Sequence, residues 1–138
     1  MSRVIKTEGG ASLRNKLMKS IALTLRELAR RTNISDETRD MVAFICLCLS
    51  VIDSTIQDSA SAWEKRGYWV KADHFRLDWE WVSIKGNVLK EAILSEDWNE
   101  IRSILPYLIN QCRQIKISSS MKKTALWQGS YKIMIQKK

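Results

Sequence analysis

The spacing of apolar residues between positions 68 and 93 constrains the fold of this chain more than any other feature. These residues recur at alternating steps of four and three, at Tyr68, Ala72, Phe75, Trp79, Val82, Gly86, Leu89 and Ile93. Because an α-helix has 3.6 residues per turn, such steps place the side chains on one helix face, in a seam like that of a coiled coil. We therefore predict one long helix over about 68–94.

This predicted helix carries a second apolar stripe, roughly 140–180° around the axis from the first. Its members are Val70, Leu77, Trp81, Ile84 and Val88. A helix with two apolar faces either lies between two neighbours or keeps one face for another subunit. Because an exposed apolar face is a liability unless a partner covers it, we favour a position in the centre of the fold.

Residues that interrupt helices are scarce, since the 138 residues include five glycines and one proline. Apolar periodicity predicts further helices over about 12–31, 35–66 and 97–115. Ser35 is a good N-cap, Gly67 is a typical terminating glycine, and Asp97 resembles the first residue of a capping box. Pro106 should bend or split the last of these helices. The sequence thus predicts an all-α bundle of four or five helices.

The ends of the chain are less regular. Residues 1–10 finish in Gly9-Gly10, and we expect a flexible lead-in there, followed by a helical bundle over 11–117 and a basic C-terminal tail over 118–138. Within the tail, 122–127 favours a helical turn, whereas 131–135 alternates like a strand. The sequence does not choose between these conformations.

Charge is distributed unevenly along the chain, whose net charge is +8. Residues 1–33 and 110–138 are strongly basic, and the second of these segments contains no acid, whereas residues 34–109 carry 13 acids against eight bases. Basic ends around an acidic middle often contact a polyanion. The alternative interpretation is a domain with charged, solvated ends.

Four cations, Lys16, Lys19, Arg26 and Arg30, fall opposite the apolar stripe of the first predicted helix. They extend over about 21 Å of helix, and phosphates on one DNA strand are about 3.4 Å apart, so this row could follow several phosphates without reading base sequence. Leu23 within the row and Glu27 beside it favour the alternative of a solvated face. The residues predicted to contact nucleic acid are Lys16, Lys19, Arg26, Arg30, Arg31, Lys65, Arg66, Lys71, Lys122 and Lys123.

Catalytic and metal-binding patterns are absent from the sequence. His74 is the single histidine, and no phosphate-binding loop, nucleophile elbow or HExxH motif occurs. Cys46, Cys48 and Cys112 lack CxxC spacing, which favours free thiols in a reducing compartment. The apolar run 41–52 is shorter than a membrane span, and no signal peptide precedes it. We expect a non-catalytic cytoplasmic protein with no cofactor, no metal and no membrane contact.

Six tryptophans are unusual for this length. Their rings could stack on exposed bases, although Trp79 and Trp98 lie on predicted core stripes. Trp69 and Trp127 have no such explanation.

The segment Ala62–Trp81 (AWEKRGYWVKADHFRLDWEW) resembles small subunits of multi-subunit CRISPR effector complexes of the Cascade type. Lys71-Ala72-Asp73, Phe75-Arg76 and Trp79 carry the likeness, which is nearest to the type I-D form. The resemblance implies a non-catalytic helical protein of antiviral defence that lines a ribonucleoprotein and binds RNA or DNA. There it would contact the backbone of the guide–target duplex or the displaced strand, and pack against other subunits or copies of itself. The alternative is a helical adaptor whose basic face meets an acidic protein or membrane surface.

Overall fold

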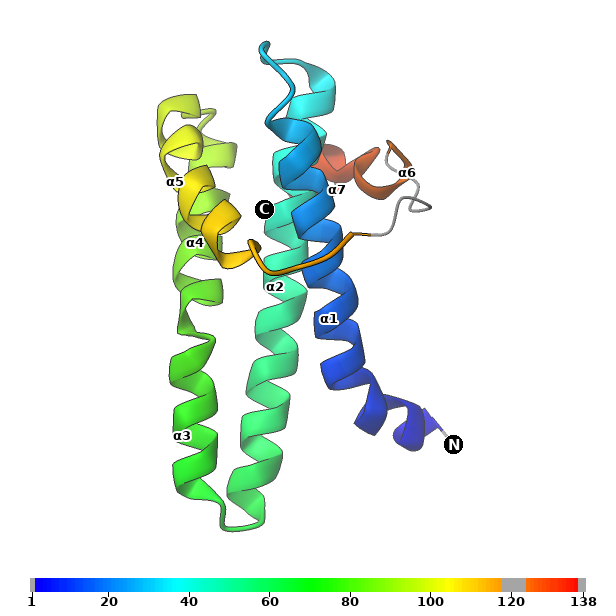
Figure 1. Ribbon diagram of the computed structural model, residues 1–138, viewed down its shortest axis with the longest axis vertical. Coiled ribbons are helices and arrows are strands. Elements are labelled where there is room, and N and C mark those ends of the chain that lie inside the picture. The colour runs from blue at the N-terminus through cyan, green and yellow to red at the C-terminus, as the bar shows by residue number, and fades with distance from the viewer. Residues whose placement is uncertain (1, 118–123, 137–138) are drawn as a thin grey trace.

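The structure, a computed structural model, describes residues 2–117 and 124–136. Its regular structure there is entirely α-helical, which confirms the predicted all-α bundle. The helices are α1 (Ser2–Leu28), α2 (Asp36–Lys65), α3 (Trp69–Asp78), α4 (Glu80–Leu94), α5 (Trp98–Gln111), α6 (Thr124–Trp127) and α7 (Ser130–Gln136). In Figure 1, α1, α2 and the pair α3–α4 run along the long axis, and α5 folds back beside α4.

Helix α2 is the centre of the fold, because α1, α3, α4, α6 and α7 all pack against it. It begins as predicted: the Ser35 hydroxyl accepts a hydrogen bond from the Thr38 backbone N–H (3.2 Å), and the Ser35 N–H donates to the Thr38 hydroxyl (2.7 Å). This reciprocal pair is a capping box, which satisfies two backbone groups that the helix itself cannot. Side chains such as Met41, Ile45 and Ile52 have no exposed surface at all.

Helix α2 is also long and apolar enough to cross a membrane, by length and composition alone. Half of its most apolar 18-residue window is buried inside the bundle. Core helices of bundles share this composition, so the feature is weak evidence for a membrane.

The first apolar seam lies where the sequence predicts it from Ala72 onward, whereas Tyr68, the first predicted member, is 54% exposed. Ala72, Val82 and Leu89 are fully buried, and they face α2. The predicted single helix over 68–94 is, however, interrupted at Trp79, where α3 ends and α4 begins. No glycine or proline marks this break. At the break the Trp79 ring stacks at 6.2 Å on the ring of Trp81 and lies near the Arg14 guanidinium.

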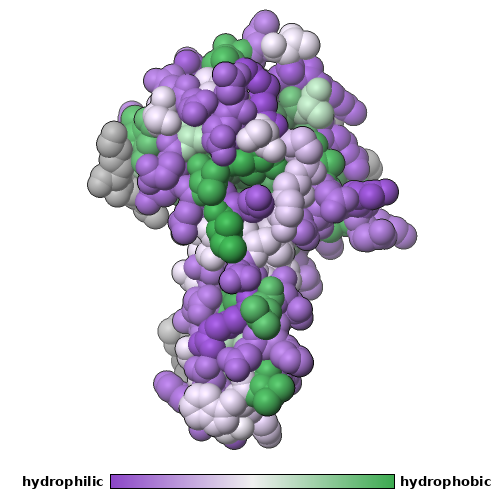
Figure 2. Space-filling view, turned by 90° about the vertical axis from the view of Figure 1, so that its left-hand side faces the viewer, coloured by the Kyte–Doolittle hydropathy of each residue, from purple (hydrophilic) through white to green (hydrophobic). Residues whose placement is uncertain are grey.

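The second apolar stripe is exposed, so our expectation that it lies in the centre of the fold was wrong. Val70, Leu77, Ile84 and Val88 expose 69%, 65%, 50% and 37% of their surface. Figure 2, which faces this side of the molecule, shows apolar patches along its length. The physical reason is that α2 covers only one face of α3 and α4. Of these two helices, α4 is the one against which α5 packs, near Trp81, whose ring lies 6.2 Å from that of Tyr107.

Helices α1 and α5 differ from prediction in their extent. Helix α1 begins at Ser2, ten residues before the predicted start, so that the segment 2–10, predicted as a flexible lead-in, forms its first turns. Helix α5 is continuous through Pro106 and is not split at Leu105. Its predicted cap is confirmed, because the Asp97 carboxylate accepts a hydrogen bond from the Glu100 N–H (3.1 Å).

The C-terminal segment belongs to the bundle, which corrects the predicted tail. Residues 124–136 form α6 and α7 on the surface of α2, and the strand-like segment 131–135 is helical. Trp127 is 2% exposed and donates its indole N–H to the Glu37 carboxylate (3.3 Å). The Asp40 carboxylate accepts hydrogen bonds from the backbone N–H groups of Gly129 (3.1 Å) and Tyr131 (2.9 Å). Apolar burial and these bonds hold the segment in place.

The three cysteines are free and buried. Burial raises the pKa of Cys46 and Cys112 to about 11 and that of Cys48 to about 12, so each is a neutral thiol. They contribute to the core as small apolar side chains.

Candidate nucleic-acid interface

The four cations predicted to line α1, Lys16, Lys19, Arg26 and Arg30, are all exposed. They do not form an open row, however, because Leu23 among them is 3% exposed and Glu27 beside them is 6% exposed. The covered strip between the cations follows from the packing of α1, which is buried on most of its circumference between residues 18 and 28. The cations therefore border a packed surface instead of forming one uninterrupted basic face.

Two of the predicted arginines on this side are engaged by carboxylates. Arg30 forms an ion pair with Glu27 (3.4 Å). Arg31 contacts Glu27 (3.7 Å) and Glu37 (3.1 Å), which ties the end of α1 to the start of α2. The hydrogen bond from Arg31 lowers the pKa of Glu37, and the same contact raises the pKa of Arg31. Arg31 is thus a structural cation, less available to an external anion than Lys16, Lys19 or Arg26.

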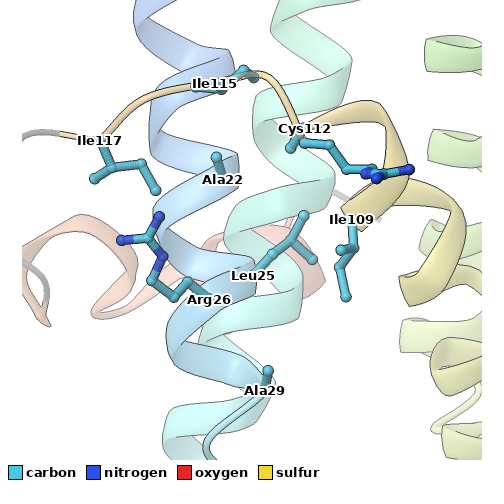
Figure 3. Close-up of a pocket in the computed structure, with 9 residues that line it drawn as sticks. Ala22, Leu25, Arg26, Ala29, Ile109, Cys112, Ile115 and Ile117 are labelled. Atoms are coloured by element: carbon cyan, nitrogen blue, oxygen red, sulfur yellow. The ribbon is translucent and has the colours of Figure 1, made fainter.

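An apolar cavity of about 290 Å³ lies between α1 and the end of α5. Figure 3 shows Arg26 on the α1 side and Ile109 and Cys112 on the α5 side, with Ile115 and Ile117 on the segment that crosses above. The cavity is lined by Ala22, Leu25, Arg26, Ala29, Ile109, Cys112, Arg113, Ile115 and Ile117. Two guanidinium groups, from residues 87 positions apart in sequence, therefore border one hollow.

The charge around this cavity is positive. Arg113 is exposed, and the bond that its guanidinium makes is to the neutral side-chain oxygen of Asn110 (3.4 Å). Lys116 is exposed and lies between two lining residues, and Lys19 is two turns before Arg26 on α1. Within residues 2–117 and 124–136, no carboxylate forms an ion pair with Lys19, Arg26, Arg113 or Lys116. We call these four residues the α1–α5 basic surface.

Arg113 and Lys116 were not among the residues predicted from the sequence. The sequence signal for these two residues is the absence of acids over 110–138, which indicates a basic end of the chain but does not single out either residue. Arg113 and Arg26 line the same cavity because α5 packs against α1, and this proximity cannot be derived from local sequence.

The predicted residues Lys65, Arg66 and Lys71 form a separate group at the turn between α2 and α3. All three are exposed, and the Lys71 ammonium lies 4.5 Å from the centre of the Trp63 ring. In Figure 1 this turn is at the end of the molecule opposite the connection between α1 and α2, residues 29–35, which contains Arg30 and Arg31. The structure therefore divides the predicted cations between two places. Lys122 and Lys123, also predicted, lie outside the described residues.

Arg14, which is not among the residues predicted from the sequence, is buried where α1 meets α2 and α3. It is 8% exposed, and burial lowers its pKa. Its guanidinium donates to the Thr55 hydroxyl (3.2 Å) and lies over the rings of Phe75 (5.0 Å) and Trp79 (6.0 Å). Because it is enclosed by these partners, Arg14 stabilises the fold by cation–π contact and does not face an external anion.

The tryptophans differ in their availability for stacking on bases. Trp127 is buried and cannot do so, whereas Trp69 exposes 61% of its surface. Trp63 packs edge-on against Phe75 with ring centres 4.8 Å apart. Trp79, Trp81 and Trp98 are partly buried against the core.

Within the described part of the chain, no group of three or more His, Cys, Asp or Glu residues is placed to hold a metal ion. His74 is exposed on α3. Comparison of the chain with protein-family models, with curated proteins and with solved structures finds no match in any of the three.

Proposed function

We propose that this chain binds the sugar–phosphate backbone of nucleic acid through the α1–α5 basic surface, without reading base sequence. The observation that carries the proposal is that Arg26 and Arg113 border one cavity with no carboxylate paired to either among the described residues. Like charges repel, and a bound polyanion relieves this repulsion while releasing its own counterions.

The narrower form of the proposal is a non-catalytic small subunit of a CRISPR ribonucleoprotein effector. It rests on the resemblance of Ala62–Trp81 to Cascade-type small subunits. The exposed apolar stripe of α3 and α4 supports it, because a subunit of an assembly needs surfaces for its neighbours and exposed apolar patches are typical of protein contacts. Copurification with RNA and with other effector subunits tests this form.

The second candidate is an adaptor that meets an acidic protein or a membrane surface. The same exposed stripe favours a protein partner. A helical adaptor of this kind would bind nucleic acid only through its overall net charge, so two variants that lose the same number of charges at different places should lose the same affinity. Unequal losses would favour the α1–α5 basic surface, and this comparison therefore separates the two candidates.

Fluorescence anisotropy with a labelled duplex, titrated at several salt concentrations, provides this comparison. The test variant carries Arg26→Gln, Arg113→Gln and Lys116→Gln, and the control carries Lys90→Gln, Arg102→Gln and Lys132→Gln, three exposed cations on α4, α5 and α7. Both lose three charges. Each phosphate contact contributes about 0.9 to the slope of log K against log salt, so the slope should fall by about 2–3 in the test variant and by less than about 1 in the control.

Circular dichroism establishes that both variants fold. An equal loss of affinity in the two variants, or no duplex binding by the wild type at low salt, contradicts the proposal.

A further inference from the structure

The turn between α2 and α3 is a rigid, protruding tip. The backbone N–H of Tyr68 donates to the Trp63 carbonyl (2.9 Å), and that of Gly67 donates to the Glu64 carbonyl (2.9 Å). These two bonds form a Schellman motif, which requires the positive φ of 86° that Gly67 adopts. The residues that follow are therefore held in one orientation at the end of the molecule (Figure 1).

Two aromatic rings project from this tip. Tyr68 and Trp69 expose 54% and 61% of their surface, although large aromatic side chains in globular proteins usually have most of their surface buried. Neither ring belongs to the core or to a ring–ring contact within the described residues. Exposed aromatic faces of this kind are available for stacking.

The tip is also positively charged. Lys65, Arg66 and Lys71 are exposed, and none forms an ion pair with a carboxylate in the described part of the chain. The nearest acid in sequence, Glu64, is engaged by Arg76, which donates both guanidinium branches to it. That contact lowers the pKa of Glu64, which is thus held as an ion-paired carboxylate.

The start of α3 adds donors for an anion at the same place. Tyr68 makes no side-chain cap, and the N–H of Ala72, which donates to the Tyr68 carbonyl (3.1 Å), is the first to bond within the helix. The N–H groups of residues 69–71 therefore lie at the positive end of the helix dipole without a partner inside the helix. Such groups favour phosphate oxygens.

We infer that this tip is a second nucleic-acid contact, specific for single strands, in which bases stack on Trp69 and Tyr68. Phosphates would then lie against Arg66, Lys71 and the first N–H groups of α3. The single strand is favoured over the duplex because base faces are open to stacking only where they are unpaired and splayed apart. The inference goes beyond backbone binding by the α1–α5 basic surface and does not depend on it.

The test uses anisotropy with a labelled oligothymidylate of about 15 nucleotides, within the site size of typical single-strand binders, alongside a duplex. Trp69→Ala should weaken binding of the single strand by at least about fivefold, the lower end of what alanine substitution costs at a stacking site. Trp69→Phe should retain most of the affinity, and duplex affinity should change by less than about twofold, since backbone contacts do not use the ring.

Leu77→Ala is the matched control, because Leu77 is equally exposed (65%) on α3 but cannot stack. Equal effects of Trp69→Ala and Leu77→Ala would overturn the inference. So would an effect of Trp69→Ala on anionic phospholipid vesicles but not on oligothymidylate, which would assign the tip to a membrane. If the wild type does not bind the duplex while Trp69→Ala still weakens binding of the single strand, the proposed function is contradicted and the inference about the tip is supported.

Discussion

Replacement of Trp127 by alanine should destabilise the protein strongly, although Trp127 lies within the segment that the sequence marks as a basic tail. The ring is 2% exposed and is among the largest fully buried side chains. Truncation of a buried tryptophan typically costs about 3–5 kcal/mol, which here includes about 1 kcal/mol for the lost hydrogen bond to Glu37. In a domain of this size each kcal/mol lowers the melting temperature by about 3 °C, so a decrease of roughly 10–15 °C is expected.

Urea denaturation followed by far-UV circular dichroism measures this effect without relying on tryptophan emission. Trp69→Ala is the matched control, because the same substitution is made at a ring that is 61% exposed, and it should change the free energy of unfolding by less than about 1 kcal/mol. Trp127→Phe keeps an apolar ring but loses the N–H donor and should fall between the two. A loss below about 1 kcal/mol for Trp127→Ala, indistinguishable from the control, would refute the packing of residues 124–136 on α2.

Two further predictions concern backbone conformation and thiol chemistry. Gly67→Ala should lower the free energy of unfolding by about 1–2 kcal/mol, because φ of 86° is strained for any residue with a Cβ. Gly86→Ala should raise it by up to about 1 kcal/mol, since Gly86 lies within a helix and the added Cβ would meet Leu49 at an ordinary 3.5 Å. Urea titrations that rank the two variants the other way would contradict this. The three thiols should resist Ellman's reagent at pH 8 and react on denaturation, and rapid labelling of the native protein would be incompatible with their burial. The free energy of unfolding should fall as the pH rises above about 9 toward 11, because the unfolded chain releases thiol protons that the folded chain, in which the thiols are buried, retains.

The exposed stripe of α3 and α4 and the tip at their N-terminal end lie on one continuous part of the molecule. Val70, the most exposed member of the stripe, directly follows Trp69. A strand held at the tip would therefore lie beside the surface that is available to a neighbouring protein. In an assembly, nucleic-acid contacts at the tip and protein contacts along α3 and α4 would then be adjacent, while the α1–α5 basic surface would act at the other end of the molecule.

Local sequence predicted the all-α fold and several helix ends, although it missed the early start of α1, the break at Trp79 and the helices α6 and α7. Ser35, Gly67 and Asp97 act through hydrogen bonds and backbone angles that involve residues three to five positions away, so their roles could be predicted without knowledge of the fold. From Ala72 to Ile93 the seam likewise predicted which face of α3 and α4 is buried, because helical periodicity alone brings those side chains together.

Tertiary packing decided what local sequence could not. Whether the second face of α3 and α4 is covered depends on how the other helices pack. In the described part of the chain α2 lies on the first face, and Val70, Leu77 and Ile84 on the second face remain exposed. The burial of Trp127 and the approach of Arg113 to Arg26 join residues about 90 positions apart, through contacts that no local pattern encodes. The periodicity of a helix specifies which side chains share a face, but the neighbour on that face is set by the arrangement of the whole chain.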